Sequence, residues 1–177
     1  MPAAPAIKRP FAEVYEDHFS YVYNLLYMQV LHRQQAEDLT SDTFYKALSA
    51  YDRFDPAMAS ERTWLARIAQ RLLIDHYRSR ASNKVDAVTD EVLGTIPYTE
   101  QAYEQITDTT TQAVQLLLAS LDEEERQILI MRYFMDMKNP AIAEFLHITP
   151  KAVSERFRRV LPKCQKQMEK LHLTEYL

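Results

Sequence analysis

The chain has 177 residues, of which 47% are hydrophobic and 26% are charged, and its formal net charge is −4 at pH 7. This composition is typical of a globular protein of one or two domains, and the small net charge argues against nucleic-acid binding over the whole surface. Because Gly94 is the only glycine and Cys164 the only cysteine, β-hairpins, glycine-rich phosphate loops and internal disulfides are disfavoured, and we expect an all-α protein.

The amino-terminal tail, residues 1–10, reads MPAAPAIKRP and lacks the continuous apolar segment of a signal peptide. The chain has no apolar run of the roughly 18 residues that indicate a membrane-spanning helix. Its five histidines are scattered, without companion cysteines at metal-ligand spacing. We therefore expect a cytoplasmic protein with no membrane insertion, no metal and no cofactor.

Residues 11–80 are predicted to form a first helical domain. Apolar side chains recur at helical spacing from Phe11 to Leu26, and again from Ala36 to Leu48, which predicts two amphipathic helices. Opposite the second apolar stripe lie three acidic residues, Glu37, Asp38 and Asp42.

A break follows these two helices, with the sequence YDRFDPAMASE, in which Pro56 marks an interruption. A third helix is predicted from about residue 62 to residue 80. Its apolar positions are Leu65, Ile68, Ala69 and Leu72. Its predicted exposed positions include Arg67, Arg71 and Arg78.

Residues 81–110 are predicted to connect two domains. From residue 81 to residue 119 the chain has six acids and one base, and this stretch includes Gly94 and Pro97 but few large apolar residues. Such a composition is typical of a linker. We therefore expect two small helical domains joined by a flexible acidic linker.

Residues 111–177 are predicted to form the second domain. A leucine-rich helix should end near Leu118, and the next should begin with a capping box, formed by Ser120 and Glu123 or by Asp122 and Glu125. The stretch AIAEFLHITPKAVSERFRR, residues 141–159, then predicts two amphipathic helices joined by a tight turn, which is a helix-turn-helix.

Local signals set the ends of these last two helices. Asn139 and Thr149 are the predicted N-caps, and each is followed by a proline at the first helical position. Pro162 lies where the second helix would continue, so an end or kink is expected near Leu161.

The exposed face of the second helix is rich in positive charge. Residues 151–170 have seven bases against two acids, which is consistent with a surface that reads DNA. Lys151, Ser154, Glu155 and Arg158 could reach base edges in the major groove, while Arg156 and Arg159 could hold phosphates. The alternative is a solvated basic face, because positive charge alone conveys no sequence specificity.

Three segments in this order resemble the extracytoplasmic-function (ECF) sigma factors of bacterial RNA polymerase. They are AEDLTSDTFYKAL, WLARIAQRLLIDHYRSR, and LDEEERQILIMRYF followed by IAEFLHITPKAVSERFRR. The resemblance covers nearly the whole chain. It implies a region-two-like domain at 11–80, a region-four-like domain at 111–177, and three partners: core RNA polymerase, promoter DNA as duplex and melted strand, and an anti-sigma factor.

The resemblance also implies the contacts. Those to the polymerase clamp are Glu37, Asp38, Ser41 and Asp42; those to the unpaired minus-ten element are Tyr51, Arg53, Phe54, Arg67, Arg71 and Arg78; and those to the minus-thirty-five duplex are Lys151, Ser154, Glu155, Arg156, Arg158 and Arg159. The chain departs from the family pattern at three places. The family usually has Gln-Glu at Ser41 and Asp42, Asn at Arg71, and Gly at His147, where histidine still tolerates a positive φ.

Other interpretations apply to single residues. The acidic residues could be a solvated helix face. Trp64 is expected to be core because it shares a helical face with Ile68. Tyr51 and Phe54 could stack on bases or pack inside the protein. Cys164 has basic neighbours that could lower its pKa, although a lone thiol is usually inert.

Two other functions are considered. A free-standing helix-turn-helix regulator would need an effector domain or a dimerisation zipper, and neither is evident. An enzyme is disfavoured because the chain has no evident nucleophile–base pair, metal-ligand set or phosphate loop.

Overall fold

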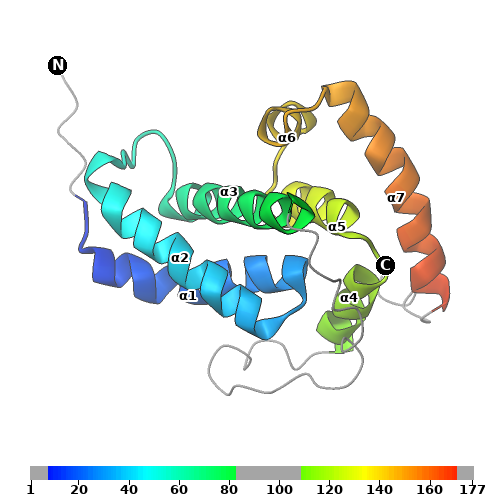
Figure 1. Ribbon diagram of the computed structural model, residues 1–177, viewed down its shortest axis with the longest axis horizontal. Coiled ribbons are helices and arrows are strands. Elements are labelled where there is room, and N and C mark those ends of the chain that lie inside the picture. The colour runs from blue at the N-terminus through cyan, green and yellow to red at the C-terminus, as the bar shows by residue number, and fades with distance from the viewer. Residues whose placement is uncertain (1–7, 83–108, 171–177) are drawn as a thin grey trace. The chain divides into compact units, whose positions relative to one another are not determined.

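The computed structural model describes residues 8–82 and 109–170, and the chain divides into two compact units, residues 1–95 and 96–177 (Figure 1). Within the described ranges the regular secondary structure is entirely helical, without a strand, which confirms the predicted all-α fold class. In these ranges no helix is both long and apolar enough to cross a membrane. Most of the predicted acidic linker, 81–110, lies outside the described residues.

The first unit is built from three long helices, α1 (Phe11–Val30), α2 (Arg33–Ala50) and α3 (Glu61–Ser82), with a short 3₁₀ turn, η1 (Tyr51–Arg53), after α2. Each long helix packs on the other two (Figure 1). Their shared core contains Val14, Val22, Leu25, Leu26, Ala36, Leu39, Phe44, Ala47, Leu65, Ala69 and Leu73. Complete burial of a leucine side chain contributes about 1.5–3 kcal/mol, so the leucine cluster is a main source of this unit's stability.

The predicted apolar faces of α2 and α3 differ slightly from the observed ones. Leu48 was placed in the apolar stripe of α2, but its side chain is 57% exposed. On α3, Leu65 and Ala69 are buried as predicted, whereas Ile68 and Leu72 are only half-buried and Leu73 is buried instead. The buried face of α3 is therefore rotated relative to the prediction.

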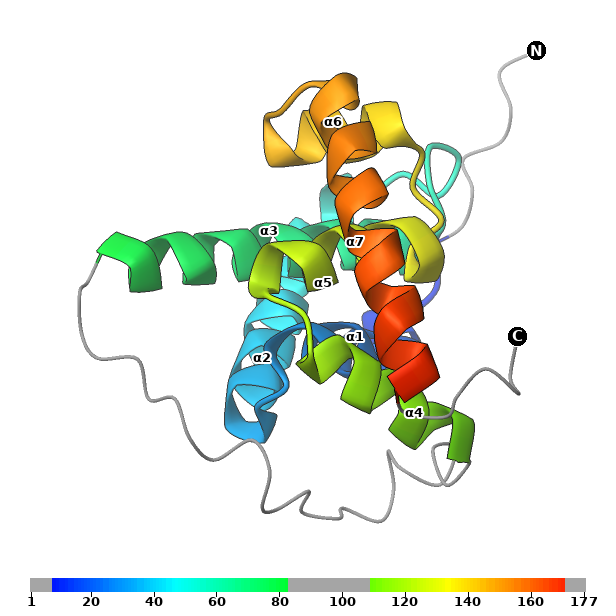
Figure 2. The same cartoon turned by 90° about the vertical axis from the view of Figure 1, so that its right-hand side faces the viewer.

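The second unit contains α4 (Thr109–Ala119), α5 (Glu123–Leu129), a π-helical turn η2 (Ile130–Phe134), α6 (Asn139–Leu146) and α7 (Pro150–Lys170). Both views show α6 beside the start of α7 and α4 beside its carboxyl-terminal part (Figures 1 and 2). The core of this unit includes Leu118, Leu121, Ile128, Met131, Ile142, Val153 and Val160. Of the two predicted capping boxes, the structure forms the one between Asp122 and Glu125.

Two expectations about helix ends in this unit differ from the structure. Of the end or kink predicted near Leu161, the end is not found, because α7 continues through Pro162 to Lys170. Pro162 is exposed, while Val160 and Cys164 on either side of it are buried against the unit, and this packing holds the helix together where the proline removes one hydrogen bond. At the start of α6, Lys138 occupies the N-cap position, and the side chain of Asn139 does not cap the helix.

Candidate nucleic-acid interface

The predicted acidic residues of α2 lie on its solvent-facing side. Asp38, Ser41 and Asp42 are exposed and Glu37 is half-buried, while Ala36, Leu39 and Thr43 face the core. Two of these acids are held along the helix, because Arg33 Nε donates to Glu37 Oε1 at 2.7 Å and Gln34 Nε2 donates to Asp38 Oδ1 at 3.0 Å. The four predicted contact residues therefore lie together on one part of the surface.

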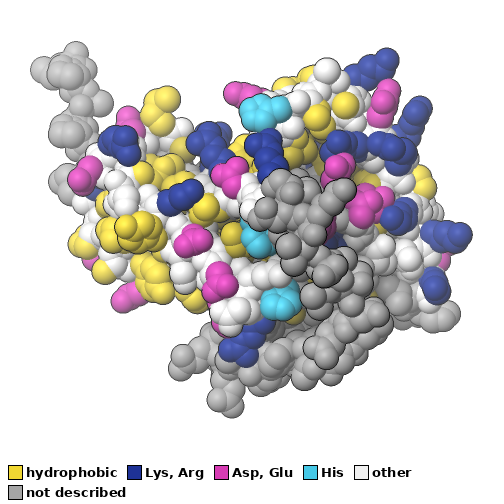
Figure 3. Space-filling view, viewed as in Figure 1, with side chains coloured by type: hydrophobic (Ala, Val, Ile, Leu, Met, Phe, Trp, Pro, Cys, Tyr) yellow, Lys and Arg dark blue, Asp and Glu magenta, His cyan; other side chains and the backbone are white. Residues whose placement is uncertain are grey.

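The same face of α2 carries two large apolar side chains, Tyr45, for which no role was predicted, and Leu48, which was predicted to lie in the apolar stripe. Tyr45 is 74% exposed and Leu48 is 57% exposed. They follow Ser41 and Asp42 at spacings of three to seven residues, which places them on one helical face. Figure 3 shows hydrophobic side chains among acidic ones over the surface of the first unit. For Tyr45 a signal was present in the sequence, since it follows Asp42 by three residues and Ser41 by four.

The loop after α2 rests on a buried aromatic cluster. The rings of Phe54 and Trp64 lie 4.6 Å apart between centroids, and that of Tyr51 lies 6.0 Å from each of them. Tyr51 is 9% exposed and Phe54 only 5%. The interpretation of Tyr51 and Phe54 as rings offered to unpaired bases does not fit this burial, because stacking needs an open ring face. Trp64, which was predicted to be core, is half-buried and packs on both rings.

The loop exposes a methionine and an arginine, together with several smaller or acidic residues. Met58 is 84% exposed, and Arg53 is exposed at the start of the loop. The backbone between them is turned by Asp55, whose Oδ1 accepts a hydrogen bond from the Ala57 amide at 2.9 Å and whose carbonyl accepts one from the Met58 amide at 3.1 Å. Met58 was not predicted as a site residue, because no sequence pattern distinguishes an exposed methionine from a buried one.

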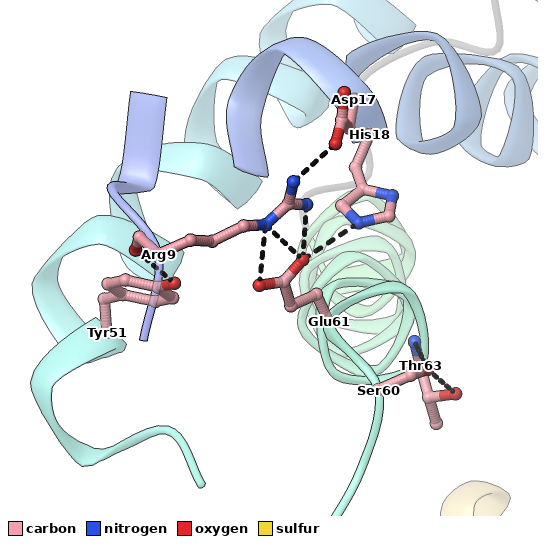
Figure 4. A network of polar contacts seen from close by, with 7 residues as sticks. All are labelled: Arg9, Asp17, His18, Tyr51, Ser60, Glu61 and Thr63. Carbon is pink, nitrogen blue, oxygen red and sulfur yellow. Dashed lines mark hydrogen bonds and ion pairs between the residues drawn. The ribbon is translucent and has the colours of Figure 1, made fainter. Parts of the chain in front are cut away.

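The amino-terminal end of the first unit is tied to both ends of this loop (Figure 4). Lys8 Nζ donates to the carbonyl oxygens of Tyr51 and Asp52, at 3.0 and 2.7 Å. Arg9 donates from Nη2 to Glu61 Oε2 at 2.6 Å and from Nε to both carboxylate oxygens at 3.1 Å. The Tyr51 hydroxyl in turn donates to the Arg9 carbonyl oxygen at 2.9 Å.

The network around Arg9 shifts the acidity of its members. Hydrogen bonds from Arg9 hold the pKa of Glu61 below its usual value, with His18 Nε2 at 3.3 Å as a further contact of that carboxylate. Arg9 Nη1 also donates to Asp17 and lowers the pKa of that carboxyl group. Burial, more than any nearby charge, raises the pKa of the Tyr51 phenol.

The three predicted arginines of α3 lie along one exposed face. Arg67, Arg71 and Arg78 are all exposed, and their separations of four and seven residues bring them onto the same side of the helix. This basic row begins at Arg67, six residues after the first residue of α3, Glu61. At about 1.5 Å of helix rise per residue, that separation is about 9 Å along the helix axis. The row can therefore receive the phosphates of a strand whose bases lie at the loop.

The helix-turn-helix has the predicted local geometry. His147 ends α6 in the left-handed region, at φ 54° and ψ 41°. The Ile148 amide then donates to the Ala143 carbonyl at 2.9 Å. Thr149 caps α7, because its Oγ1 accepts a hydrogen bond from the Ala152 amide at 3.1 Å. The turn and the start of α7 are thus fixed by hydrogen bonds to the backbone.

The outer face of α7 carries most of the predicted duplex contacts. Its exposed members are Lys151, Ser154, Glu155, Arg158 and Arg159. Figure 3 shows the Lys and Arg side chains gathered along this helix. Ser154 is already engaged, since its hydroxyl donates to the Pro150 carbonyl and accepts from Asn139 Nδ2, both at 3.1 Å. Asn139 thus links the two helices of the motif rather than capping the first.

Arg156 does not lie with the other basic residues. Its side chain is only 29% exposed, and its Nη1 lies 3.1 Å from Glu124 Oε2 of α5. Lys163 likewise pairs with Glu125 of α5 at 2.5 Å, a contact that raises the pKa of the lysine. The interpretation of Arg156 as an open phosphate contact therefore does not fit its position. It joins α5 to α7.

The remaining candidates give no chemical site. Cys164 is buried, and burial raises the pKa of its thiol, which opposes the activation that its basic neighbours could provide. No group of three His, Cys, Asp or Glu side chains in residues 8–82 and 109–170 could hold a metal ion. The arrangement that the described residues do provide is one acidic and apolar helix face and two basic ones.

This arrangement matches a known family. Residues 14–83 match the family model for sigma-70 region 2, and residues 111–164 match that for sigma-70 region 4. The RNA polymerase sigma factor CnrH of Cupriavidus metallidurans is 30% identical over 137 residues, covering 72% of this chain and 70% of its own. The ECF RNA polymerase sigma factor SigX of Bacillus subtilis is 26% identical over 174 residues, covering 93% of this chain and 87% of its own.

Two solved structures share the fold. The sigma factor RpoE of Bartonella quintana, in complex with the anti-sigma factor NepR, matches with a TM-score of 0.60 at 15% identity, over 90% of this chain and 96% of its own. CnrH, in complex with the cytosolic domain of CnrY, matches with a TM-score of 0.55 at 23% identity, over 90% of this chain and 88% of its own. The chain belongs to the ECF sigma factors of RNA polymerase, and it directs promoter-specific transcription initiation.

Proposed function

We propose that this sigma factor binds core RNA polymerase through the outer face of α2, with Glu37, Asp38, Ser41 and Asp42 as its polar contacts. The observation that carries this proposal is the combination of exposed acids with two large apolar side chains, Tyr45 and Leu48, on one helix face. Acids exposed to water steer a basic partner, and neighbouring exposed apolar side chains favour burial in an interface. We therefore add Tyr45 and Leu48 to the polymerase contacts.

The minus-ten element is proposed to bind across the loop after η1 and along α3. The exposed residues of that region include Arg53 and Met58 of the loop and Arg67, Arg71 and Arg78 of the helix, and the loop also exposes Asp52 and Asp55. Arginines neutralise the phosphates of a single strand, and an exposed apolar side chain can contact the face of an unstacked base. Tyr51 and Phe54 then support the loop from beneath, without direct contact with the bases.

The minus-thirty-five element is proposed to bind as duplex to α7, the second helix of the helix-turn-helix. Residues near the amino terminus of such a helix face base edges in the major groove. Among the exposed side chains, Lys151, Glu155 and Arg158 are proposed to read bases, and Arg159 to hold a phosphate. Ser154 is held in place by Asn139, so it can offer its hydroxyl in one fixed orientation.

An anti-sigma protein is the third proposed partner, and the chain is proposed to act in the cytoplasm without any catalytic activity of its own. Both solved structures that share the fold are complexes, one with the anti-sigma factor NepR and one with the cytosolic domain of CnrY. In this chain Tyr45 and Leu48 of the first unit and Leu116 and Leu161 of the second are more than a third exposed. These apolar side chains are suited to burial beneath a protein partner.

The polymerase proposal is tested by charge reversal. Asp38→Lys combined with Asp42→Lys should weaken binding of fluorescently labelled chain to core polymerase by at least tenfold, because both substitutions place like charges against a basic surface. The control, Glu13→Lys with Glu16→Lys on α1, makes the same change in net charge at two other exposed positions. Equal affinities for the two double variants would contradict the assignment of α2. Specific DNA binding as a dimer that core polymerase does not enhance would favour a free-standing regulator.

A further inference from the structure

The segment formed by Lys8 and Arg9 bridges the two ends of the loop between η1 and α3. Lys8 holds the carbonyls of Tyr51 and Asp52 at one end. Arg9 holds the carboxylate of Glu61 at the other end, as Figure 4 shows. We propose that this segment is a strap that keeps the loop in the conformation that receives the unpaired minus-ten strand, with Arg9 as a positioning residue. The proposal rests on the proposed role of that loop.

The strap is itself firmly placed. The Tyr51 hydroxyl donates to the Arg9 carbonyl, so the backbone of the strap is fixed to the aromatic cluster beneath the loop. Arg9 meets Glu61 with three donor–acceptor contacts between 2.6 and 3.1 Å, and such charge-assisted, bidentate pairs have defined geometry as well as strength. The strap therefore fixes both the distance between the loop ends and the direction in which α3 begins.

Besides the strap, ring packing spans the loop, since the Phe54 ring before it lies 4.6 Å between centroids from the Trp64 ring after it. The hydrogen bonds of the loop are local, formed by Asp55 with Ala57 and Met58 at one end and by Ser60 with Thr63 at the other. Met58 lies between them with 84% of its surface exposed. A loop with fixed ends has fewer conformations than the same loop with one end released. Loss of the strap should therefore lower the fraction of molecules whose loop is ready to receive DNA.

The charge of Arg9 is engaged inside the protein. Its guanidinium contacts two carboxylates, those of Glu61 and Asp17, so its role is distinguishable from that of a phosphate contact. A lysine or arginine that binds phosphate contributes to the salt dependence of DNA affinity, and its removal lowers the slope by about 0.7–0.9. A positioning residue instead changes affinity through the population of the binding-competent loop, which leaves the slope unchanged.

The experiment uses the complex of the full chain with core polymerase and a forked promoter DNA whose minus-ten segment is unpaired. Affinity is measured at several salt concentrations for wild type, Arg9→Ala and Lys8→Met. If strap removal leaves a tenth of the loops competent, affinity for the fork falls about tenfold at every salt concentration. Affinity for core polymerase and for a minus-thirty-five duplex should stay within about twofold. Lys163→Ala, which removes an ion pair with Glu125 in the second unit, is the control and should behave as wild type.

A second variant separates the strap from simple electrostatics. Glu61→Ala removes a negative charge, so electrostatics alone predicts tighter DNA binding. The strap predicts weaker binding, and it predicts that Arg9→Ala with Glu61→Ala is no weaker than either single variant, because both break one interaction. Circular dichroism spectra identical to wild type confirm that each variant is folded. The strap proposal would be wrong if Arg9→Ala left the affinity for the fork unchanged or reduced its salt slope. It would also be wrong if the losses of the two single variants multiplied in the double variant.

The proposed role of the loop is tested in the same assay by Arg53→Ala with Arg71→Ala. These two residues are proposed to contact the strand itself, so their removal should weaken fork binding and lower the salt slope by about 0.7 for each lost contact. If this variant binds the fork as wild type does, the proposed minus-ten surface is wrong. If it binds weakly while Arg9→Ala and Lys8→Met bind normally, only the strap is wrong.

Discussion

Replacement of His147 by glycine should stabilise the helix-turn-helix. The histidine lies at φ 54° and ψ 41°, a conformation that costs a non-glycine residue about 1–2 kcal/mol. Glycine removes that cost but increases the conformational freedom of the unfolded chain, which offsets about 0.5–1 kcal/mol. The net gain is therefore about 0.5–1 kcal/mol. His147→Val should destabilise the turn, since a β-branched residue fits the left-handed region worse than histidine does.

Hydrogen exchange of the Ile148 amide measures this effect locally, because that amide donates to Ala143 across the turn. A stabilisation of this size should slow its exchange by about two- to fivefold in His147→Gly, provided that exchange follows opening of the turn. Glu144→Gly, inside α6, is the control and should speed exchange, since glycine weakens a helix interior. Faster exchange in His147→Gly, or the same rate in the Gly and Val variants, would refute the reasoning about backbone strain.

Further predictions concern DNA, polymerase and pH. Arg158→Ala should cost about 1–3 kcal/mol in duplex binding and relax preference at one base pair, whereas Arg156→Ala should leave that preference intact, because Arg156 pairs with Glu124; matching sequence profiles in a binding-site selection would contradict this difference. Tyr45→Ala should weaken polymerase binding without lowering the melting temperature, since the ring is 74% exposed; a lower melting temperature would instead place the ring in the fold. Arg9 lowers the pKa of Glu61, so this pair's stabilisation is present above the unfolded pKa, about 4.3, and is lost as pH falls through the lower folded pKa. The difference in unfolding free energy between wild type and Arg9→Ala should therefore shrink in acid, and a difference that grows would contradict the sign.

Features determined by local sequence were predicted well. Helical periodicity located all the long helices. The sequence offered two capping boxes for the start of α5, and the one between Asp122 and Glu125 forms. The left-handed residue at the turn was expected at His147, where the structure has it. In each case the residues concerned are within a few positions of one another, so their interaction is fixed by the chain itself.

Features determined by packing between distant segments were not predicted from the sequence. The pairing of Arg156 with Glu124 joins α7 to α5, and the contacts of Arg9 with Glu61 span 52 positions. No periodicity within one helix indicates which other helix lies beside it. Pro162 illustrates the same limit, because the local rule predicts an end or a kink, while the helix continues past it with Val160 and Cys164 buried.

Run-off transcription tests the central claim, that this sigma factor engages core polymerase through α2 and reads its promoter through the second unit. Core polymerase and a promoter that the wild-type chain recognises should yield a transcript with wild type and none without it. Asp38→Lys with Asp42→Lys should abolish the transcript. Because residues 111–177 of this double variant are identical to wild type, the full-length variant should still bind the minus-thirty-five duplex. Full transcription from the double variant, with circular dichroism showing it to be folded, would contradict the account.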